Sequence, residues 1–515
     1  MNVRRLFVRR VFGIAVTLLL PSALHASLLI WDADPTTGAT IEDGSGTWDT
    51  VGTNWSDGVQ NLAWNNATPD SALIGNGGTP GTITLGAPVT AAGITFGTLA
   101  GGNYLMTGGT LALASGATLT MNTNAVINSS LAAAGGFTVS GIGDLQLGGA
   151  NSAIAGTLGL NSGRIFFNAD TAGSTGATWS IASGATILFN TADTNYHAAQ
   201  RGAISGPAGA TLRAGGTGGP VTFFIGALGD SVYSGGTSNG PSGNLMSIAK
   251  TGTGVLTLVG TNIAHGGSNY ISSGRMILSN TTAFANGTSP ATFNIASGAT
   301  LEFAVTTGTK TLGSTATNTI TGGGTLVKSG AGLLALDEQG GAQYVIQMRM
   351  TNGLIDLQGG TLRNGGWTGQ QWTDGASWTN KSSLNVGTGT TFDVWDGNSP
   401  FFDALTGSGT IDKNSGGGDV RTLTIGANNG SGLFNGTMKN TQTYLALTKN
   451  GIGTQTLTGA NVTYSGVTTI NGGRLVLSNT TGFASGAVSN NAQLLAHLDA
   501  GNSLNFANSF TAQAR

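Results

Sequence analysis

An internal repeat constrains the fold of this chain more than any other feature. Residues 248–287 align without a gap onto residues 447–486, and 19 of the 40 aligned positions are identical. The shared frame contains a lysine, a Gly-x-Gly turn, an asparagine and a Gly-Arg pair. Its glycine and asparagine positions are Gly252, Gly254, Asn262 and Gly274 in the first copy, and Gly451, Gly453, Asn461 and Gly473 in the second. Self-similarity of this kind indicates a repeat architecture.

Further copies of the repeat extend along the chain. Residues 141–164 keep the same internal spacing, and residues 328–336 form a partial copy. A second unit, Ser-Gly-Ala-Thr followed by an apolar residue, occurs at 115–119, 183–187 and 297–301. The larger period is therefore one Gly-x-Gly unit followed by one Ser-Gly-Ala-Thr unit.

Each unit has the pattern of short β-strands. Residues 255–258, 275–278 and 299–303 place polar residues among apolar ones, and Gly, Asn and Ser clusters separate them. Such a unit cannot bury its apolar face alone, whereas stacked units share a continuous core. The sequence therefore predicts an all-β chain, a right-handed parallel β-helix or β-solenoid with an N-terminal cap. A string of Greek-key sandwiches also has short strands, but it does not explain near-identical units so far apart.

Composition agrees with this prediction and excludes several classes of protein. The chain has 88 Gly, no Cys and only 8% charged residues. Glycine at this level disfavours a helical protein, and the absence of cysteine excludes a disulfide framework. Without residues 1–26 the chain keeps 16 of its 20 basic residues and all 22 acidic ones, so its net charge is near −6. No basic patch remains for a phosphate backbone, and nucleic acid is not an expected partner.

The N-terminus has the pattern of a secretory signal peptide. Four arginines precede the apolar run 11–20, and the segment that follows it ends in a small residue, Ala26. We expect residues 1–26 to be removed by cleavage between Ala26 and Ser27, and the mature chain to be extracellular or on a bacterial cell surface. The apolar run is too short to span a membrane as a mature helix. Export by the general or the twin-arginine route stays open.

The second copy of the repeat resembles the autotransporter-associated β-strand repeat, also called the passenger-associated transport repeat. The residues that carry the resemblance are Lys449-Asn450-Gly451-Ile452-Gly453, Leu457-Thr458-Gly459-Ala460-Asn461, Tyr464-Ser465-Gly466 and Gly473-Arg474-Leu475. In the first copy His265 stands where the pattern has Tyr. The resemblance implies a β-helical passenger region of a bacterial surface or secreted protein.

Many members of that family end in a membrane β-barrel, which we do not recognise after residue 486. We therefore expect either a released protein or a fragment of a longer one, and the repeat-like end favours the fragment, with outer-membrane association in that case. The expected organisation of the chain is a signal peptide at 1–26, an N-terminal cap and first coils at 27–110, repeats at 111–365, an aromatic-rich excursion at 366–404 and repeats at 405–515.

Two aromatic clusters are candidate functional regions. Residues 27–75 contain four Trp beside several acidic residues, and we interpret them as the cap of the solenoid or as a carbohydrate platform. The segment 366–404 could contact glycans or could be a loop packed on its own aromatic rings. Its tryptophans are Trp367, Trp372, Trp378 and Trp395. Asp393 and Asp396 in the same segment could form the carboxylate pair of a glycosidase or lyase.

Other motifs predict no cofactor or metal. His197, His265 and His497 are scattered and lack the spacing of a zinc site. The repeated lysines and the arginines of the Gly-Arg pairs are interpreted as outward residues beside buried strands. The leading hypothesis is an exported non-enzymatic stalk with an adhesive or glycan-contacting role, whose partners are extracellular glycans or matrix. The alternative is a β-helical polysaccharide lyase or glycoside hydrolase, which requires a line of charged residues across consecutive coils.

Overall fold

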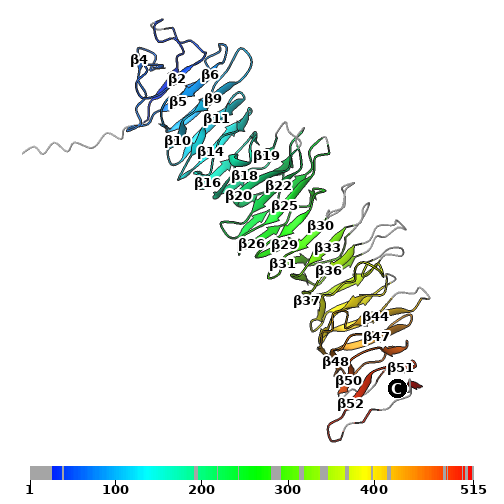
Figure 1. The fold of residues 1–515 in the computed structure, drawn as a ribbon. Helices are drawn as coiled ribbons and strands as arrows, with labels where there is room; N and C mark the ends of the chain where they lie inside the picture. The colour runs from blue at the N-terminus through cyan, green and yellow to red at the C-terminus, as the bar shows by residue number, and fades with distance from the viewer. Residues whose placement is uncertain are drawn as a thin grey trace, which may run out of the picture.

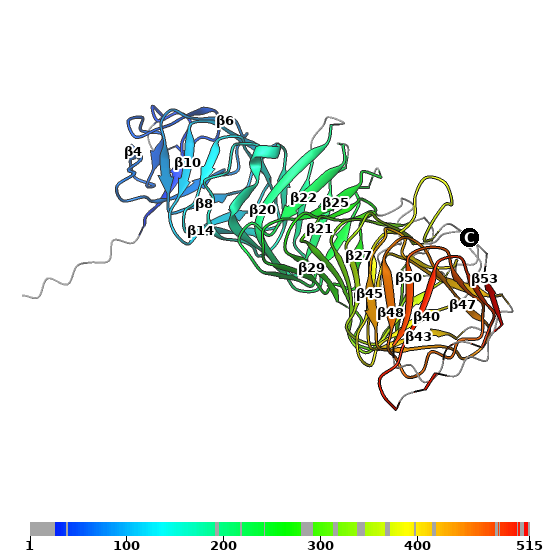
Figure 2. The ribbon, with the colours of Figure 1, turned by 60° about the horizontal axis from the view of Figure 1, so that its bottom comes forward.

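The chain folds into one elongated rod of stacked coils (Figures 1 and 2). The computed structural model describes residues 26–515 except 38–39, 191–194, 217–218, 242, 280–291, 313–317, 337–345, 366–370, 396–397, 415–418, 479–482, 484, 502, 505–508 and 513–515. In these residues the one helical element is the short 3-10 helix η1 (Asp170–Ala172), and all other regular structure is β. The predicted all-β parallel solenoid is thus confirmed.

The strands lie on three faces, and on each face parallel pairing joins one coil to the next. The first face runs the length of the rod. Its strands are β1 (Leu28–Trp31), β5 (Ser71–Ile74), β8 (Gly93–Phe96), β11 (Ala117–Met121), β14 (Gly136–Gly141), β16 (Gly156–Leu160), β18 (Ser174–Ile181), β20 (His197–Gly206), β23 (Ser231–Tyr233), β26 (Val255–Leu258), β29 (Arg275–Ser279), β31 (Thr300–Ala304), β34 (Thr325–Ser329), β37 (Leu354–Leu357), β39 (Ser383–Val386), β42 (Leu405–Gly407), β45 (Gly432–Phe434), β48 (Thr454–Leu457), β50 (Arg474–Ser478) and β52 (Gln493–His497).

The second face consists of a 10-stranded sheet followed by a 6-stranded sheet. The strands of the 10-stranded sheet are β2 (Gly46–Trp48), β6 (Thr82–Leu85), β9 (Tyr104–Gly108), β12 (Ala125–Ile127), β15 (Asp144–Leu147), β17 (Arg164–Phe167), β19 (Thr186–Phe189), β21 (Thr211–Ala214), β24 (Gly236–Ser238) and β27 (Ile263–Ala264). Those of the 6-stranded sheet are β32 (Thr309–Thr311), β35 (Leu333–Leu336), β38 (Thr361–Asn364), β40 (Thr391–Val394), β43 (Thr410–Lys413) and β46 (Thr437–Asn440).

The third face is divided into three groups of strands. The first two groups are β7 (Val89–Ala91), β10 (Thr110–Leu113) and β13 (Ser130–Ala132), then β22 (Val221–Ile225), β25 (Met246–Lys250), β28 (Asn269–Ile271), β30 (Thr292–Ile295), β33 (Thr319–Gly322) and β36 (Gln347–Met350). The third group is β41 (Phe401–Phe402), β44 (Arg421–Ile425), β47 (Leu445–Lys449), β49 (Thr468–Ile470), β51 (Val488–Asn490) and β53 (Phe510–Ala512).

Alternation along each strand generates one continuous core inside the coils. In β11 the side chains of Ala117, Leu119 and Met121 are buried, while the two threonines between them lie at the outer surface. Buried apolar residues of this kind form a single cluster from the first coils to the last. Residues bonded across neighbouring coils are separated by 20 positions at Thr118 and Thr138 and by 29 at Asp356 and Asn385, so the coils differ in length.

The N-terminal end of the rod is closed by an aromatic cap. The indoles of Trp31, Trp48, Trp55 and Trp64 are 0–2% exposed. Their ring centroids lie 4.7–5.4 Å apart in edge-to-face and tilted contacts. β1 pairs antiparallel with β3 (Trp55–Ser56), which in turn pairs antiparallel with β4 (Asn61–Leu62). Because the rings are buried, these residues serve as a plug and expose no platform for sugars.

The aromatic-rich excursion is shorter than the segment 366–404 that the sequence predicts. Within that segment β39, β40 and β41 pair in parallel with strands of neighbouring coils. Thr373 and Thr379 form an isolated antiparallel bridge in the loop before β39. Phe392 and Phe402 therefore lie on regular coils and belong to their core, whereas Trp395, just after β40, is half-buried.

Candidate functional site

The glycine and asparagine signature of the repeats has a structural role at the corners of the coils. Gly252, Gly274 and Gly451 adopt φ of +66°, and Gly473 adopts +63°, a region that side chains disfavour. At Gly453 a Cβ would lie 2.1 Å from the carbonyl oxygen of Gly430 in the preceding coil. The main-chain carbonyls of Asn262 and Asn461 accept hydrogen bonds from Thr237 and Met438 of the preceding coils. These positions fit one coil against the next.

The repeated lysines do not point outward, contrary to our interpretation of the sequence. Lys250, Lys328 and Lys449 are 0–1% exposed. The Nζ of Lys328 donates to the carbonyl oxygens of Ser329, Gly330 and Gly359 at 2.8, 2.8 and 2.9 Å. Lys250 and Lys449 each donate to three carbonyls in the same way. Tight turns leave carbonyls without backbone donors, and the ammonium groups satisfy them.

The arginines of the Gly-Arg pairs lie toward the surface and contact the neighbouring coil. Arg164 forms a bidentate ion pair with Asp144 at 2.7 Å. The Nε of Arg275 donates to Glu302 at 2.7 Å. These arginines bind side chains on adjacent strands, so they also link coils.

Arg474 differs from these two arginines in its partner. Its Nε donates to the neutral Oε1 of Gln493 at 2.7 Å. Among the described residues, the third Gly-Arg pair therefore has no carboxylate partner like those of the other two.

The three predicted glycan-contacting tryptophans that the structure describes differ in exposure. Trp372 is fully buried against Phe392 and Phe402, so neither face of its ring is available to a sugar. Trp378 and Trp395 are half-buried. The guanidinium carbon of Arg349 lies 4.7 Å from the ring centroid of Trp378, and that of Arg363 lies 3.9 Å from Trp395. Trp367 lies outside the described residues.

Asp393 belongs to a line of charges across four consecutive coils of the second face. The register places Arg363, Asp393, Asp412 and Lys439 directly beside one another on β38, β40, β43 and β46. Nε of Arg363 lies 2.9 Å from Asp393 Oδ2, and Nζ of Lys439 lies 3.3 Å from Asp412 Oδ2. Burial raises the pKa of Asp393, opposed by Arg363 and reinforced by Asp412.

The two carboxylates of this line are covered, whereas the side chain of Lys439 is 44% exposed. The side chains of Asp393 and Asp412 are only 4% and 10% exposed. Thr441 also donates two hydrogen bonds to Asp412, from its main-chain N–H to Oδ1 at 2.9 Å and from its hydroxyl to Oδ2 at 2.7 Å. Asp396, the predicted partner of Asp393, lies outside the described residues. The arrangement holds coils together and offers a substrate little access to either carboxylate.

The histidines are far apart and have different partners. His265 is buried, with its ring nitrogens 2.8 Å from Thr237 Oγ1 and 3.1 Å from Asn269 Oδ1, and burial lowers its pKa to about 4. His197 and His497 each lie beside one aspartate. Across the described ranges no group of three or more His, Cys, Asp and Glu could hold a metal ion.

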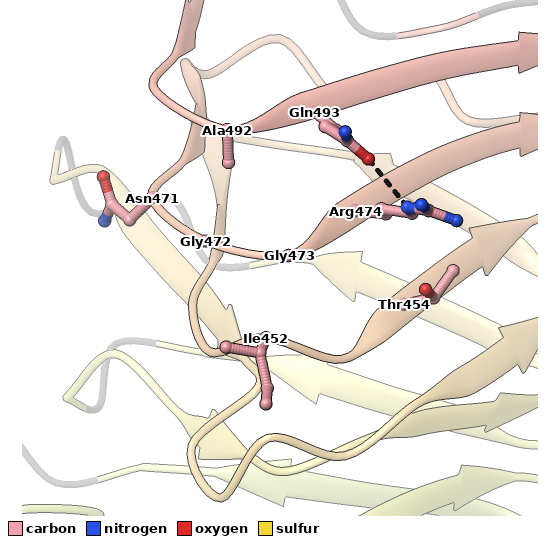
Figure 3. A pocket seen from close by; sticks show the side chains of 8 residues that line it. All are labelled: Ile452, Thr454, Asn471, Gly472, Gly473, Arg474, Ala492 and Gln493. Carbon is pink, nitrogen blue, oxygen red and sulfur yellow. Dashed lines mark hydrogen bonds between the residues drawn. The ribbon is translucent and has the colours of Figure 1, made fainter.

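Two surface hollows lie on the C-terminal coils. One, of about 370 Å³, lies on the third face and is lined by exposed Val420, Tyr444 and Val467 among other residues. The other, of about 400 Å³, lies where three turns of the first face meet (Figure 3). It is lined by Ile452, Thr454, Asn471, Gly472, Gly473, Arg474, Ala492 and Gln493.

We term this second hollow the Arg474 pocket. Sequence analysis missed it, although it lies in the second repeat copy and includes two of its signature residues, Gly473 and Arg474. The available signal was the neutral Gln493 in the following unit.

The predicted export signal falls largely outside the described residues, which begin at Ala26, so cleavage before Ser27 stays a prediction. Ser27 already contacts the solenoid, because its N–H donates to Asp70 Oδ1 at 2.7 Å. No helix in the described part of the chain is long and apolar enough to cross a membrane.

Comparison with known proteins agrees with the architecture. The passenger-associated-transport-repeat family model matches residues 248–278 and 447–477, the two copies identified above. The chain is also similar to the Adhesin BmaC autotransporter of Brucella suis biovar 1 (strain 1330), with 40% identity over 161 residues. That match covers 28% of this chain and 4% of the relative. No solved structure matches the chain.

Proposed function

We propose that this passenger-associated-transport-repeat protein is a passenger-like stalk that presents binding surfaces outside a bacterial cell. The main observation in its support is that the two matched repeats lie in one parallel solenoid, whose first face is paired from coil to coil between them, in a chain similar to an adhesin autotransporter. The similarity concerns a small part of that relative, so adhesion is part of the proposal.

The physical properties of the rod suit this role. Each coil contacts only its neighbours, so the chain can fold coil by coil once it has left the cell. The core is continuous, which makes the rod stiff, and its cap closes one end against edge-to-edge pairing. The outward threonines and asparagines give the rod a surface of hydroxyl and amide groups with few charges. Such a surface is suited to many weak contacts with glycans or matrix.

A direct test is adherence of the purified mature chain. Beads coated with the chain are passed over glycan arrays, matrix proteins and host-cell layers, with heat-unfolded chain on matched beads as control. We expect retention on at least one of these surfaces by the folded chain alone. Equal retention of folded and unfolded chain, or none on any surface, would refute the adhesive role.

A polysaccharide lyase or glycoside hydrolase is the second candidate, favoured by one observation. Asp393 and Asp412 lie on adjacent strands between two basic residues, and one carboxyl has a raised pKa. Such a pair can divide acid and base roles. Turnover of an acidic polysaccharide by the purified chain, lost in both Asp393→Asn and Asp412→Asn, would support it. Absence of turnover by folded wild-type chain across a polysaccharide panel would reject it.

A further inference from the structure

We propose that the Arg474 pocket binds the carboxylate-bearing sugar residue of an acidic glycan. The inference deepens the adhesive role proposed above and rests on it for its biological meaning. Four features of the pocket carry it: a notch in the surface, a cation without an internal counter-charge, polar groups around that cation and an apolar wall.

The notch lies at the turn between two coils, where Gly472 and Gly473 are among its lining residues. Their backbone packs closely on the preceding coil, so that a Cβ at Gly473 would be 2.2 Å from the carbonyl oxygen of Gly453. The turn before β48 rises on one side and carries Ile452, whose side chain is 82% exposed. Figure 3 shows these turns on successive coils, with Arg474 and Gln493 on the strands that leave them. The hollow measures about 400 Å³, within the range of small-molecule sites.

The charge of Arg474 is what distinguishes this turn from its copies. Arg164 is neutralised by Asp144 and Arg275 by Glu302. In the part of the chain that the structure describes, no carboxylate lies within ion-pair distance of Arg474, whose hydrogen-bond partner is the Gln493 amide. An amide can orient a guanidinium but cannot cancel its charge. The fold therefore leaves an oriented, exposed cation at the edge of a hollow.

The remaining lining matches the chemistry of a sugar ring. A guanidinium forms bidentate hydrogen bonds to a carboxylate, which fixes both position and orientation. Thr454 and Gln493 flank Arg474 and supply hydroxyl and amide groups for sugar hydroxyls (Figure 3). The Asn471 side chain points away from Arg474, where its Nδ2 donates to Asn450 Oδ1 at 2.9 Å and its Oδ1 accepts from Asn491 at 3.4 Å. Ile452 offers an apolar surface to ring C–H groups. A uronic or sialic acid unit presents all three kinds of group together.

The test uses two ligands that differ only at the acidic carbon. Methyl glucuronoside carries a carboxylate where methyl glucoside carries a hydroxymethyl group. We titrate the full chain with each ligand and follow binding by calorimetry and by saturation-transfer NMR, with N-acetylneuraminic acid as a second acidic probe. We expect at least one acidic sugar to bind 10-fold or more tightly than methyl glucoside. Equal binding of acidic and neutral sugars would overturn the proposal.

Two variants locate the site, and a third controls for the loss of an arginine. Arg474→Gln should reduce acidic-sugar affinity at least 10-fold, whereas Arg164→Gln, at a paired arginine elsewhere on the rod, should leave it unchanged. Gln493→Glu keeps Arg474 but supplies the internal carboxylate that the other copies have, and should also reduce affinity at least 10-fold. Because this change adds an ion pair, it remains informative if Arg474→Gln impairs folding. Unchanged binding in Gln493→Glu would overturn the proposal.

Two further arms test the sugar specificity of the pocket and its connection to adhesion. A glutamate-containing peptide that binds as tightly as the acidic sugars would identify a general carboxylate site and overturn the sugar assignment. Suppose that wild type binds acidic sugars, that Gln493→Glu does not, and that the chain adheres to no surface. This result would support the pocket and reject the adhesive role. If instead wild type binds no acidic sugar, and wild type and Gln493→Glu adhere equally well, the pocket proposal is rejected and the adhesive role is supported.

Discussion

Replacing a buried repeat lysine tests whether these residues stabilise the turns of the solenoid. In Lys328→Met the apolar stem is kept, but three carbonyls lose a charged donor. Hydrogen bonds to a charged group contribute roughly 2 kcal/mol each, or about 6 kcal/mol for three. Burial lowers the pKa of Lys328 from 10.5 to about 8, and that desolvation offsets about 3 kcal/mol. The net loss expected for Lys328→Met is about 2–3 kcal/mol.

Hydrogen exchange measures this loss where it occurs. Because coils of a solenoid open locally, amides of β34 and β37 should exchange about 30- to 160-fold faster in Lys328→Met, the factor that corresponds to about 2–3 kcal/mol. Lys439→Met is the control, since the Lys439 side chain is 44% exposed and its ion pair with Asp412 should contribute less than about 1 kcal/mol. Equal acceleration in both variants would refute the reasoning.

The pH dependence provides a second readout of the same lysine. The pKa of Lys328 in the folded chain, about 8, lies below its ordinary value of 10.5. The unfolded chain therefore holds this proton more tightly between pH 8 and pH 10.5. Wild type should gain stability relative to Lys328→Met as the pH rises through that interval, and lose the gain as the pH falls back to 8. A stability difference that stays constant from pH 7 to pH 10.5 would contradict the burial of this ammonium group.

Three further predictions address other parts of the fold. Burial lowers the pKa of His265 to about 4, so the free energy of unfolding should fall by up to about 3 kcal/mol as the pH falls from 6.5 to 4. Acid titration of unfolding should show this loss in wild type and not in His265→Tyr/Asn269→Thr, which copies the second repeat. Gly451→Ala should destabilise the chain by about 1–3 kcal/mol in thermal unfolding because of its φ of +66°, whereas Gly216→Ala, whose Cβ meets open space except one atom at 3.9 Å, should be near neutral. Trp55→Ala should cost about 3–5 kcal/mol and reduce the near-ultraviolet circular dichroism of the cap; an unchanged melting temperature would contradict the plug.

The sequence by itself determined the repeat, the strand pattern and the turns, and it located the aromatic cap as one of two interpretations of residues 27–75. These depend on local properties: alternation of apolar residues sets the buried side of each strand, and glycine permits the positive φ at residues such as Gly252 and Gly451. The cap followed from tryptophans gathered at one end of a stack that needs closing. Each of these signals lies within a short stretch of chain, so it is visible without knowledge of which coils are neighbours.

The tertiary structure alone decided which side chains meet between coils. Coil lengths vary, so the sequence does not indicate that Asp393 lies beside Asp412 or that Gln493 faces Arg474. The lysines were misjudged because a charged residue is expected at the surface, whereas the carbonyls of the turn and of the next coil offer Lys328 enough acceptors to be buried. Trp372 was misjudged for the converse reason, since the coil that follows it supplies Phe392 and Phe402 to cover its ring. Contacts made across the stack depend on the register of neighbouring coils, which is a property of the folded rod.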